Sequence, residues 1–558
     1  MTTLSQPALH PGRRDFLEAI PGVVLLACVL AGAARIVATY PVFNQTWDEP
    51  AHVAAGMQWI DRGTYTYEPL HPPLGRVLTA VGPWLAGIRS ADHENVWLEG
   101  NAIFHAGGRY DRNLVLARLG VLPFFIVATL AVFAWARRLG GGVAAICAVL
   151  LFTTLPPILA HAGIATTDIA ITSTVVLASY ATIRWLEQPT VGRSVLLGLA
   201  AGAALLSKFS ALLFLPAAAA AIVMCRWGEW RPRPAASSTA GRRSRLRIAY
   251  AAALLTVWAG YRFAVGPLTP GGAVQADVQP GASNALDRLA AAPIFPAPAL
   301  FEGVGHLAAK NRAGHKSYLL GEVRNTGWWY FFPVALAVKT PLAFILLCAV
   351  GTFAGARAPP GSERRRQLEP VAIAVAILLV CLPSRINIGL RHVLPMYPFL
   401  AITAGVGLAS LGRFRRAAPA GIVGAALLLG WHLVASIRAH PDYLAYFNEL
   451  AGEQPERILV DSDLDSGQDL KRLADTLRAR RISAVSIAYA GSATVAEHGL
   501  PPVRWLEPHR PVNGWVAASL YSLKLGSLDR PGHDDFAWLE RYAPVARVGR
   551  SIRLYYIP

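Results

Sequence analysis

Apolar residues in this sequence fall in blocks of about twenty positions rather than at the spacing of a half-buried strand or an amphipathic helix. A helix of that length crosses the hydrocarbon layer of a bilayer, so the pattern predicts a polytopic α-helical membrane protein. The predicted blocks are residues 20–43, 114–135, 143–160, 165–185, 195–224, 248–265, 329–353, 370–383, 392–411 and 419–437.

The block at 195–224 has basic residues at both ends, namely Arg193 and the segment 226–247. A single crossing would place one of these clusters outside, against the positive-inside rule. We therefore predict two short helices that meet near residues 206–210 and present Lys208 near the outer surface, which gives about 11 transmembrane segments. A lysine in an apolar setting is typical of a functional site, and the alternative is a lysine that reaches lipid headgroups.

The remaining basic clusters lie between blocks and assign the sides of the membrane. They predict an N-terminus inside, a C-terminus outside, and three long outer segments at 44–113, 266–328 and 438–558. The first block follows Arg13 and Arg14 but is longer than a signal-peptide core, so we interpret it as an uncleaved span. The chain is thus expected to divide into a membrane region, 1–437, and an extracytoplasmic domain, 438–558.

The region after residue 438 has the composition of a soluble α/β domain. Strands are expected at 457–460 and 482–489, with a helix at 467–480. The acidic run at 461–469 resembles a calcium loop, but its glycine is one place late and Arg472 stands where the bidentate glutamate belongs. Turn formation and helix capping are the favoured interpretation of this run.

Net charge, cysteine content and amino-acid composition limit the partners, sites and membrane that we expect for this protein. The formal net charge is +18, yet basic residues form short clusters without a continuous stripe, so no nucleic-acid partner is expected. The five cysteines lie in or at the ends of apolar blocks, which indicates neither a disulfide framework nor a zinc site. Abundant alanine and arginine favour a bacterial protein of the inner (plasma) membrane.

Candidate chemistry begins directly after the first block, at Asp48, Glu49, Pro50 and His52. Proline in a first turn predicts a short amphipathic helix on the outer membrane surface. Asp48 and Glu49 could act in catalysis there, or could cap the helix and favour its dipole.

Further candidates are expected on the same outer surface. His71 and Arg76 belong to a second surface helix that begins near residue 68, and Asp168 begins the span at 165–185, where it is either a site residue or a cap. Lys208, Arg391 and His392 supply the positive charge that an anionic lipid headgroup requires.

These groups together suggest a reaction. A carboxylate at the membrane surface can take a proton from an acceptor hydroxyl while cations stabilise a departing phosphate. Two adjacent acids at one helix start are poorly placed for a double displacement, so we expect inversion by single displacement.

The ordered motifs Asp48-Glu49-Pro50, His71-Pro72-Pro73-Leu74, Ala165-Thr166-Thr167-Asp168, GAALLSK at 202–208 and RHVLP at 391–395 resemble the GT-C superfamily. The similarity covers about 22–411 and is greatest to bacterial relatives of protein O-mannosyltransferases and of the lipid A aminoarabinose transferase.

The resemblance implies a glycosyltransferase with a polyprenyl-phosphate (undecaprenyl-type) sugar donor. It also implies that Asp48 is catalytic with Glu49 as its partner, and that Asp168, Lys208 and the His71 region frame the lipid-phosphate site. Leu70-His71 replaces the Glu-Lys pair of the lipid A branch, so that branch's substrate contacts are not transferred. The acceptor, whether protein, lipid or polysaccharide, and any divalent metal cofactor stay open.

Two other functions fit parts of this pattern. A transporter or flippase of a lipid-linked sugar would use the same cations but needs a polar path across the bilayer, and apart from Lys208 the blocks contain almost no deep ionisable residue. A noncatalytic sensor would bind glycan through the outer domain. We therefore predict a GT-C-like glycosyltransferase with its site outside the membrane.

Overall fold

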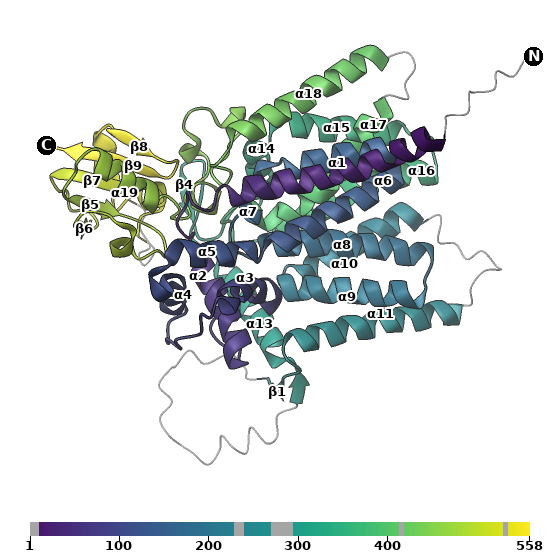
Figure 1. The fold of residues 1–558 in the computed structure, drawn as a ribbon, viewed down its shortest axis with the longest axis horizontal. Coiled ribbons are helices and arrows are strands. Elements are labelled where there is room, and N and C mark those ends of the chain that lie inside the picture. The colour runs from purple at the N-terminus through teal and green to yellow at the C-terminus, as the bar shows by residue number, and fades with distance from the viewer. Residues whose placement is uncertain (1–10, 228–238, 269–293, 412–417, 528–533) are drawn as a thin grey trace, which may run out of the picture.

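The computed structural model describes residues 11–227, 239–268, 294–411, 418–527 and 534–558. Figure 1 shows a bundle of mostly aligned helices with a mixed α/β domain at one end, which confirms a largely helical membrane protein with a C-terminal sheet. The bundle's long helices are α1 (Pro11–Val37), α6 (Leu122–Thr153), α8 (Asp168–Glu187), α9 (Val191–Ser207), α10 (Ala211–Arg226), α11 (Thr239–Gly260), α15 (Leu342–Arg357), α16 (Ser362–Cys381), α17 (Tyr397–Leu411) and α18 (Ala418–Arg438).

Shorter elements gather mainly at the domain end of this bundle. They are α2 (Glu49–Met57), α3 (Pro73–Leu85), α4 (Val96–His105), α5 (Tyr110–Leu119), α7 (Pro156–Ala162), α13 (Pro298–Ala313), α14 (Phe331–Lys339) and a 3₁₀ segment, η4 (Leu390–Met396). Two small hairpins pair β1 (Val265–Pro267) with β2 (Ile294–Pro296) and β3 (Ser317–Leu319) with β4 (Glu322–Arg324).

Within the described residues, five helical stretches are long and apolar enough to cross a membrane. They are Ile20–Val37, Tyr110–Thr153, Asp168–Glu187, Leu390–Ser410 and Pro419–Arg438. The predicted span at 329–353 is not one continuous helix, because α14 and α15 meet at an angle of 109°. Thr340 precedes Pro341 and is extended, with ψ 132°, as a residue before proline prefers.

The long stretch that ends at Thr153 is interrupted at Gly141, where φ is 81° and ψ is −166°. Only glycine adopts this conformation readily, so it separates the predicted blocks at 114–135 and 143–160. The second block was predicted to run on to residue 160. Helix α6 instead ends at Thr153, and Pro156 and Pro157 begin the separate helix α7.

The predicted break in the block at 195–224 is confirmed. Helix α9 ends at Ser207, Lys208 is extended with φ −162° and ψ 143°, and α10 begins at Ala211. The two helices are therefore short, and Lys208 lies at their junction on the domain side of the bundle.

Close packing at small residues joins the central helices. A Cβ atom added to Gly407 in α17 would lie 2.2 Å from the Cα of Gly351 in α15, and one added to Gly405 would lie 2.6 Å from the backbone nitrogen of Ala148 in α6. Helices in a membrane associate through such close contact because lipid provides no hydrophobic drive between them.

The C-terminal domain contains one five-stranded mixed sheet in the order β6-β5-β7-β9-β8. Its strands are β5 (Val485–Ala488), β6 (Val503–Trp505), β7 (Gly514–Ser519), β8 (Ala546–Val548) and β9 (Ile552–Ile557). Strand β5 is parallel to β6 and β7, and β9 is antiparallel to β7 with Ala517 opposite Leu554. The amphipathic helix α19 (Leu470–Ala479) packs its leucines onto this sheet.

Two further predictions are wrong. The expected strand at 457–460 is absent, and two 3₁₀ turns occur there, Pro455–Arg457 and Asp461–Asp463. Helix α2 is not a surface helix, because all its residues are buried against α3 and α4. Both the polar and the apolar side chains of α2 therefore contact protein rather than lipid.

The glycine contact between α15 and α17 gives a direct test of the packing. We expect Gly407→Val to lower the thermal unfolding temperature of the purified protein, with a cost of about 1–3 kcal/mol, because the valine would separate the two backbones. Gly424→Val in α18 is the matched control, since its Cβ would have no neighbour within 4 Å. Equal unfolding temperatures for both variants would contradict this packing.

Candidate active site

A cavity of about 740 Å³ lies between the helical bundle and the C-terminal domain. Helices α2, α3, α8, α10, α13 and α16 line it together with η4 and the loop after residue 460. The predicted site residues on its wall are Asp48, His52, His71, Arg76, Asp168, Lys208, Arg391 and His392, whereas Glu49 is not part of the lining.

Asp48 and Arg391 form an ion pair on this wall. Asp48 precedes α2 but makes no side-chain capping bond, so helix capping does not explain it. Burial alone would raise the pKa of Asp48, but the charge and hydrogen bond of Arg391 outweigh burial and hold that pKa well below its ordinary value. The carboxylate is ionised at neutral pH and 30% exposed, so it can meet a ligand.

A second ion pair joins Lys208 to Asp168, with 2.7 Å between Nζ and Oδ1. Asp168 is the first residue of α8 and makes no cap bond; its other oxygen accepts from Thr166 Oγ1 at 3.2 Å and lies 3.8 Å from His161 Nδ1. The ammonium of Lys208 is therefore held at the α9–α10 break with its side chain 16% exposed to the cavity.

The two predicted histidines are linked through Arg76 and Glu68. Arg76 Nε donates to His52 Nδ1 at 3.0 Å and its guanidinium pairs with Glu68, which also lies 3.1 Å from His71 Nδ1. Burial, reinforced by nearby cations, lowers the pKa of His71 to about 3 and that of His52 well below its usual value. Both rings are thus neutral hydrogen-bonding groups.

Glu49 occupies a different environment from its neighbour. It is fully buried and accepts hydrogen bonds from Arg118 at 2.8 and 2.9 Å, from Thr46 N at 2.7 Å and from Ala165 N at 2.8 Å. Its oxygens are saturated by these donors and do not face the cavity.

The rest of the cavity is largely apolar. His392 stacks with Phe332, with 6.1 Å between ring centroids, and leucines and phenylalanines of α10 and α13 continue this wall. Leu212 and Leu213 of α10 are 44% and 55% exposed on a membrane helix, so the cavity opens toward the lipid phase. This arrangement suits a ligand with a charged head and a long apolar tail.

Four charged lining residues were not predicted as site residues: Glu68, Lys310, Asp461 and Asp465. Asp461 lies after α18, in the part of the chain that leads into the C-terminal domain. Burial raises its pKa to about 7, although the positive charge of Arg391 acts to lower it. Hydrogen bonds hold its segment against η4: Ser462 donates to the Ile388 carbonyl, and Asp463 accepts from Leu390 N at 3.0 Å. The sequence favours turn formation and helix capping for the acidic run at 461–469 and does not single out its carboxyls as site residues.

Other carboxylates of the run at 461–469 accept hydrogen bonds within the C-terminal domain. Asp465 accepts from Tyr521 N at 2.7 Å and Gly467 N at 3.1 Å, and Asp469 from Ser551 Oγ at 2.8 Å. In the described part of the chain, the side chains close enough to share a metal ion are His509, Asp534 and Asp535, away from the cavity. These hydrogen bonds fit the predicted role of the run in turn formation.

Residues 111–237 match the family described as dolichyl-phosphate-mannose-protein mannosyltransferase, a region that contains Asp168 and Lys208. A search of curated proteins finds no significant match.

Solved structures share the fold at low sequence identity. ArnT from Cupriavidus metallidurans, bound to undecaprenyl phosphate, is 14% identical with a TM-score of 0.52, over 95% of this chain and 97% of that one. The S. cerevisiae protein O-mannosyltransferase Pmt1-Pmt2 complex, bound to the sugar donor, is 10% identical with a TM-score of 0.54, over 78% of this chain and 90% of that one. Residues 111–237 are therefore similar in sequence to the mannosyltransferase family, and the chain shares its fold with ArnT and with the Pmt1-Pmt2 complex.

Proposed function

We propose that the protein moves a sugar from a polyprenyl-phosphate donor of the undecaprenyl type to a hydroxyl of an acceptor, by a single inverting displacement in the cavity beside Asp48. The observation that carries this proposal is the pair of cavity-facing ion pairs, Asp48–Arg391 and Lys208–Asp168, at the head of an apolar groove. The structure of ArnT with undecaprenyl phosphate supports the donor class.

The donor's phosphate would lie between Lys208 and Arg391, with His71 and His392 as hydrogen-bonding neighbours. Its apolar chain would follow Leu212, Leu213 and the wall of α13 toward the lipid. Two cations near one phosphate stabilise the negative charge that develops as the phosphate leaves.

Donor binding would also activate Asp48. In the free protein Arg391 holds the pKa of Asp48 low, which makes its carboxylate a weak base. A phosphate that shares Arg391 withdraws part of this positive charge, so the pKa of Asp48 rises as the donor binds.

The proposed transfer forms one bond and breaks one bond at the anomeric carbon of the sugar. The acceptor oxygen forms a bond to the anomeric carbon, the bond from that carbon to the phosphate oxygen breaks, and the phosphate leaves with the electron pair. The acceptor's proton passes to the Asp48 carboxylate. His52 and Arg76 lie behind Asp48 and orient the wall of α2 and α3.

We assign Glu49 to positioning rather than to catalysis. Its carboxylate fixes the turn that presents Asp48, and its saturated oxygens leave no lone pair directed at a substrate. The adjacent residues thus divide the two tasks, one in the protein interior and one in the cavity.

We further propose that the cavity and the C-terminal domain lie outside the bacterial inner membrane. The ends of α8 and α10 away from Asp168 and Lys208 carry basic residues in ion pairs, where Arg138 bonds Glu187 at 2.7 Å and Arg226 bonds Glu369 at 2.6 Å. Positive residues favour the cytoplasmic side.

Replacement of the base tests the reaction. We expect Asp48→Asn to lower sugar transfer from a radiolabelled polyprenyl-phosphate sugar by about 10²–10⁴-fold in proteoliposomes, because an amide cannot accept the proton. Donor consumption and labelled acceptor are measured together, with Asp475→Asn, an exposed change on α19, as control. Full transfer by the Asp48 variant would refute its role as base.

The titration of Asp461 gives a second prediction. Its pKa of about 7 means that it is neutral below pH 7 and negative above, so anionic donor binding weakens as pH rises through 7. We expect the donor Kd to increase about three- to tenfold between pH 6 and 8 in the wild type and to change little in Asp461→Asn. The measurement uses the sugar-bearing donor rather than the lipid phosphate without sugar, because the terminal phosphate of the latter would itself titrate near pH 6.

Glu49 is tested by stability. Glu49→Gln leaves the buried charge of Arg118 without its partner, which we expect to cost about 3–5 kcal/mol. Thermal unfolding of the purified protein measures this loss. Normal stability combined with lost transfer would show instead that Glu49 acts in the chemistry.

A further inference from the structure

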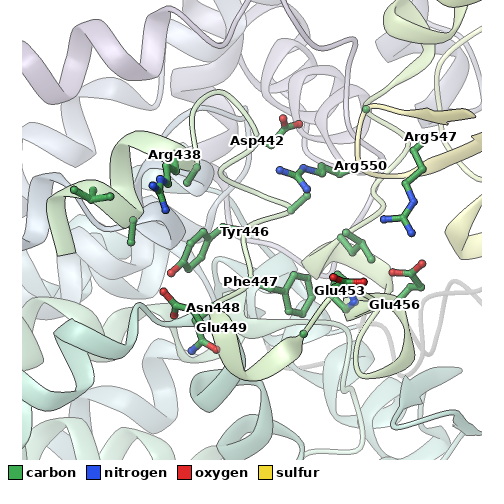
Figure 2. Close-up of a pocket in the computed structure, with 18 of the residues that line it drawn as sticks. Arg438, Asp442, Tyr446, Phe447, Asn448, Glu449, Glu453, Glu456, Arg547 and Arg550 are labelled. Carbon is green, nitrogen blue, oxygen red and sulfur yellow. The ribbon is translucent and has the colours of Figure 1, made fainter. Parts of the chain in front are cut away.

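A second cavity, of about 700 Å³, lies where α18 meets the C-terminal domain (Figure 2). It shares no lining residue with the active-site cavity. One wall is the last part of α18, and the others are the loop at 442–456 and the turn between β8 and β9.

The α18 wall lies at the membrane boundary. Helix α18 is a candidate span that ends at Arg438, and its lining residues Trp431 and Val434 are 38% and 45% exposed. The Trp431 indole donates to Glu449 at 3.1 Å, as expected of a tryptophan between hydrocarbon and headgroups. The cavity is therefore at headgroup depth, beside a lipid-facing helix.

Three arginines on its wall lack a side-chain partner within the described residues: Arg438, Arg547 and Arg550. In Figure 2, Arg438 from α18 and Arg550 from the domain extend into the space between these two elements. A fourth arginine, Arg553, is already neutralised by Glu456 at 2.9 Å. The free guanidinium groups form a site for a phosphate.

Carboxylates face the same space. Glu453 has no partner in the described chain, and Glu449 bonds only the neutral indole of Trp431. Unneutralised groups of both signs within one cavity are suited to a headgroup that carries both charges. A purely anionic ligand would meet the repulsion of these glutamates.

We propose that this cavity binds the headgroup of a zwitterionic glycerophospholipid with a primary ammonium group, the chemistry of phosphatidylethanolamine. The phosphodiester contacts Arg438 and Arg550, the ammonium faces Glu449 and Glu453, and the acyl chains follow α18 past Val434 into the bilayer.

This site is connected to the active site by one short segment. Leu464 lines the lipid cavity, while Asp461, Ser462 and Asp465 line the active-site cavity on the other side. A bound lipid would contact Leu464, on the side of this segment that faces away from the active-site cavity. The same lipid would contact both α18 and the C-terminal domain. Binding should therefore stabilise the folded protein.

The test uses the purified full chain in detergent and its thermal unfolding temperature. Phosphatidylethanolamine, phosphatidylcholine and phosphatidylglycerol with identical acyl chains are titrated separately, as is inorganic phosphate. We expect a saturable rise with phosphatidylethanolamine, a smaller rise with the other two lipids and none with phosphate. The Arg438→Gln/Arg550→Gln variant should weaken the phosphatidylethanolamine response about tenfold in half-saturating concentration.

A double variant of two exposed arginines elsewhere in the domain, Arg480→Gln/Arg504→Gln, matches the change in charge and should keep the wild-type response. Glu453→Gln, at an exposed position, should reduce the preference for phosphatidylethanolamine over phosphatidylcholine. Equal responses to all three lipids, an equal response to inorganic phosphate, or an unchanged response in the Arg438/Arg550 variant would each overturn the proposal. The last outcome leaves the glycosyltransferase function untouched, because neither arginine lines the catalytic cavity.

Discussion

The buried ion pair between Glu49 and Arg118 is the constraint on which the site depends. Arg118 also donates to the carbonyl oxygens of Tyr40, Phe43 and Asn44, at 3.4, 3.3 and 2.9 Å, so it holds the chain between α1 and α2. Glu49 in turn accepts from Ala165 just before α8. One pair therefore fixes the end of the first span, the start of α2 and the approach to Asp168.

The turn between α1 and α2 is also attached to the C-terminal domain. Asn44 donates to the Gly467 carbonyl at 2.7 Å and accepts from Leu470 N at 2.8 Å, and Trp47 N donates to the Ser466 carbonyl at 2.9 Å. Asp48 thus lies between two anchored neighbours. The ion pairs of the molecule differ accordingly: Glu49–Arg118 is closed to solvent, whereas Asp48–Arg391 and Lys208–Asp168 face space that a ligand can occupy.

Much of the site could be predicted from the sequence because its members lie at the ends of apolar blocks, and the positive-inside rule places several such ends on one side. The Lys208 junction is the sharpest example, since basic flanks on both sides require a break that α9 and α10 confirm. The roles of Asp48 and Glu49 could not be separated in this way. Which neighbour faces the interior depends on Arg118, a contact across 69 positions.

Asp461 shows the other limit of sequence reasoning. Its acidic run has a local explanation as a turn, and only the packing of that turn against η4 brings Asp461 to the cavity wall. The bend between α14 and α15 was missed for a related reason. An apolar block predicts that a segment avoids water, but it does not predict the direction of the chain. At Pro341 that direction depends on neighbours such as Asn448, which donates to the Thr340 carbonyl at 2.6 Å.

The wide spacing of the cavity's residues has a consequence for biosynthesis. Asp48 and its partner Arg391 are 343 positions apart, and at usual rates of translation the second emerges roughly 20 to 70 s after the first. During that interval the nascent chain carries an incomplete site with an uncompensated carboxylate at the membrane. A ligand that needs both charges can therefore be held between Asp48 and Arg391 only after synthesis has passed η4 and the last helices of the bundle have packed.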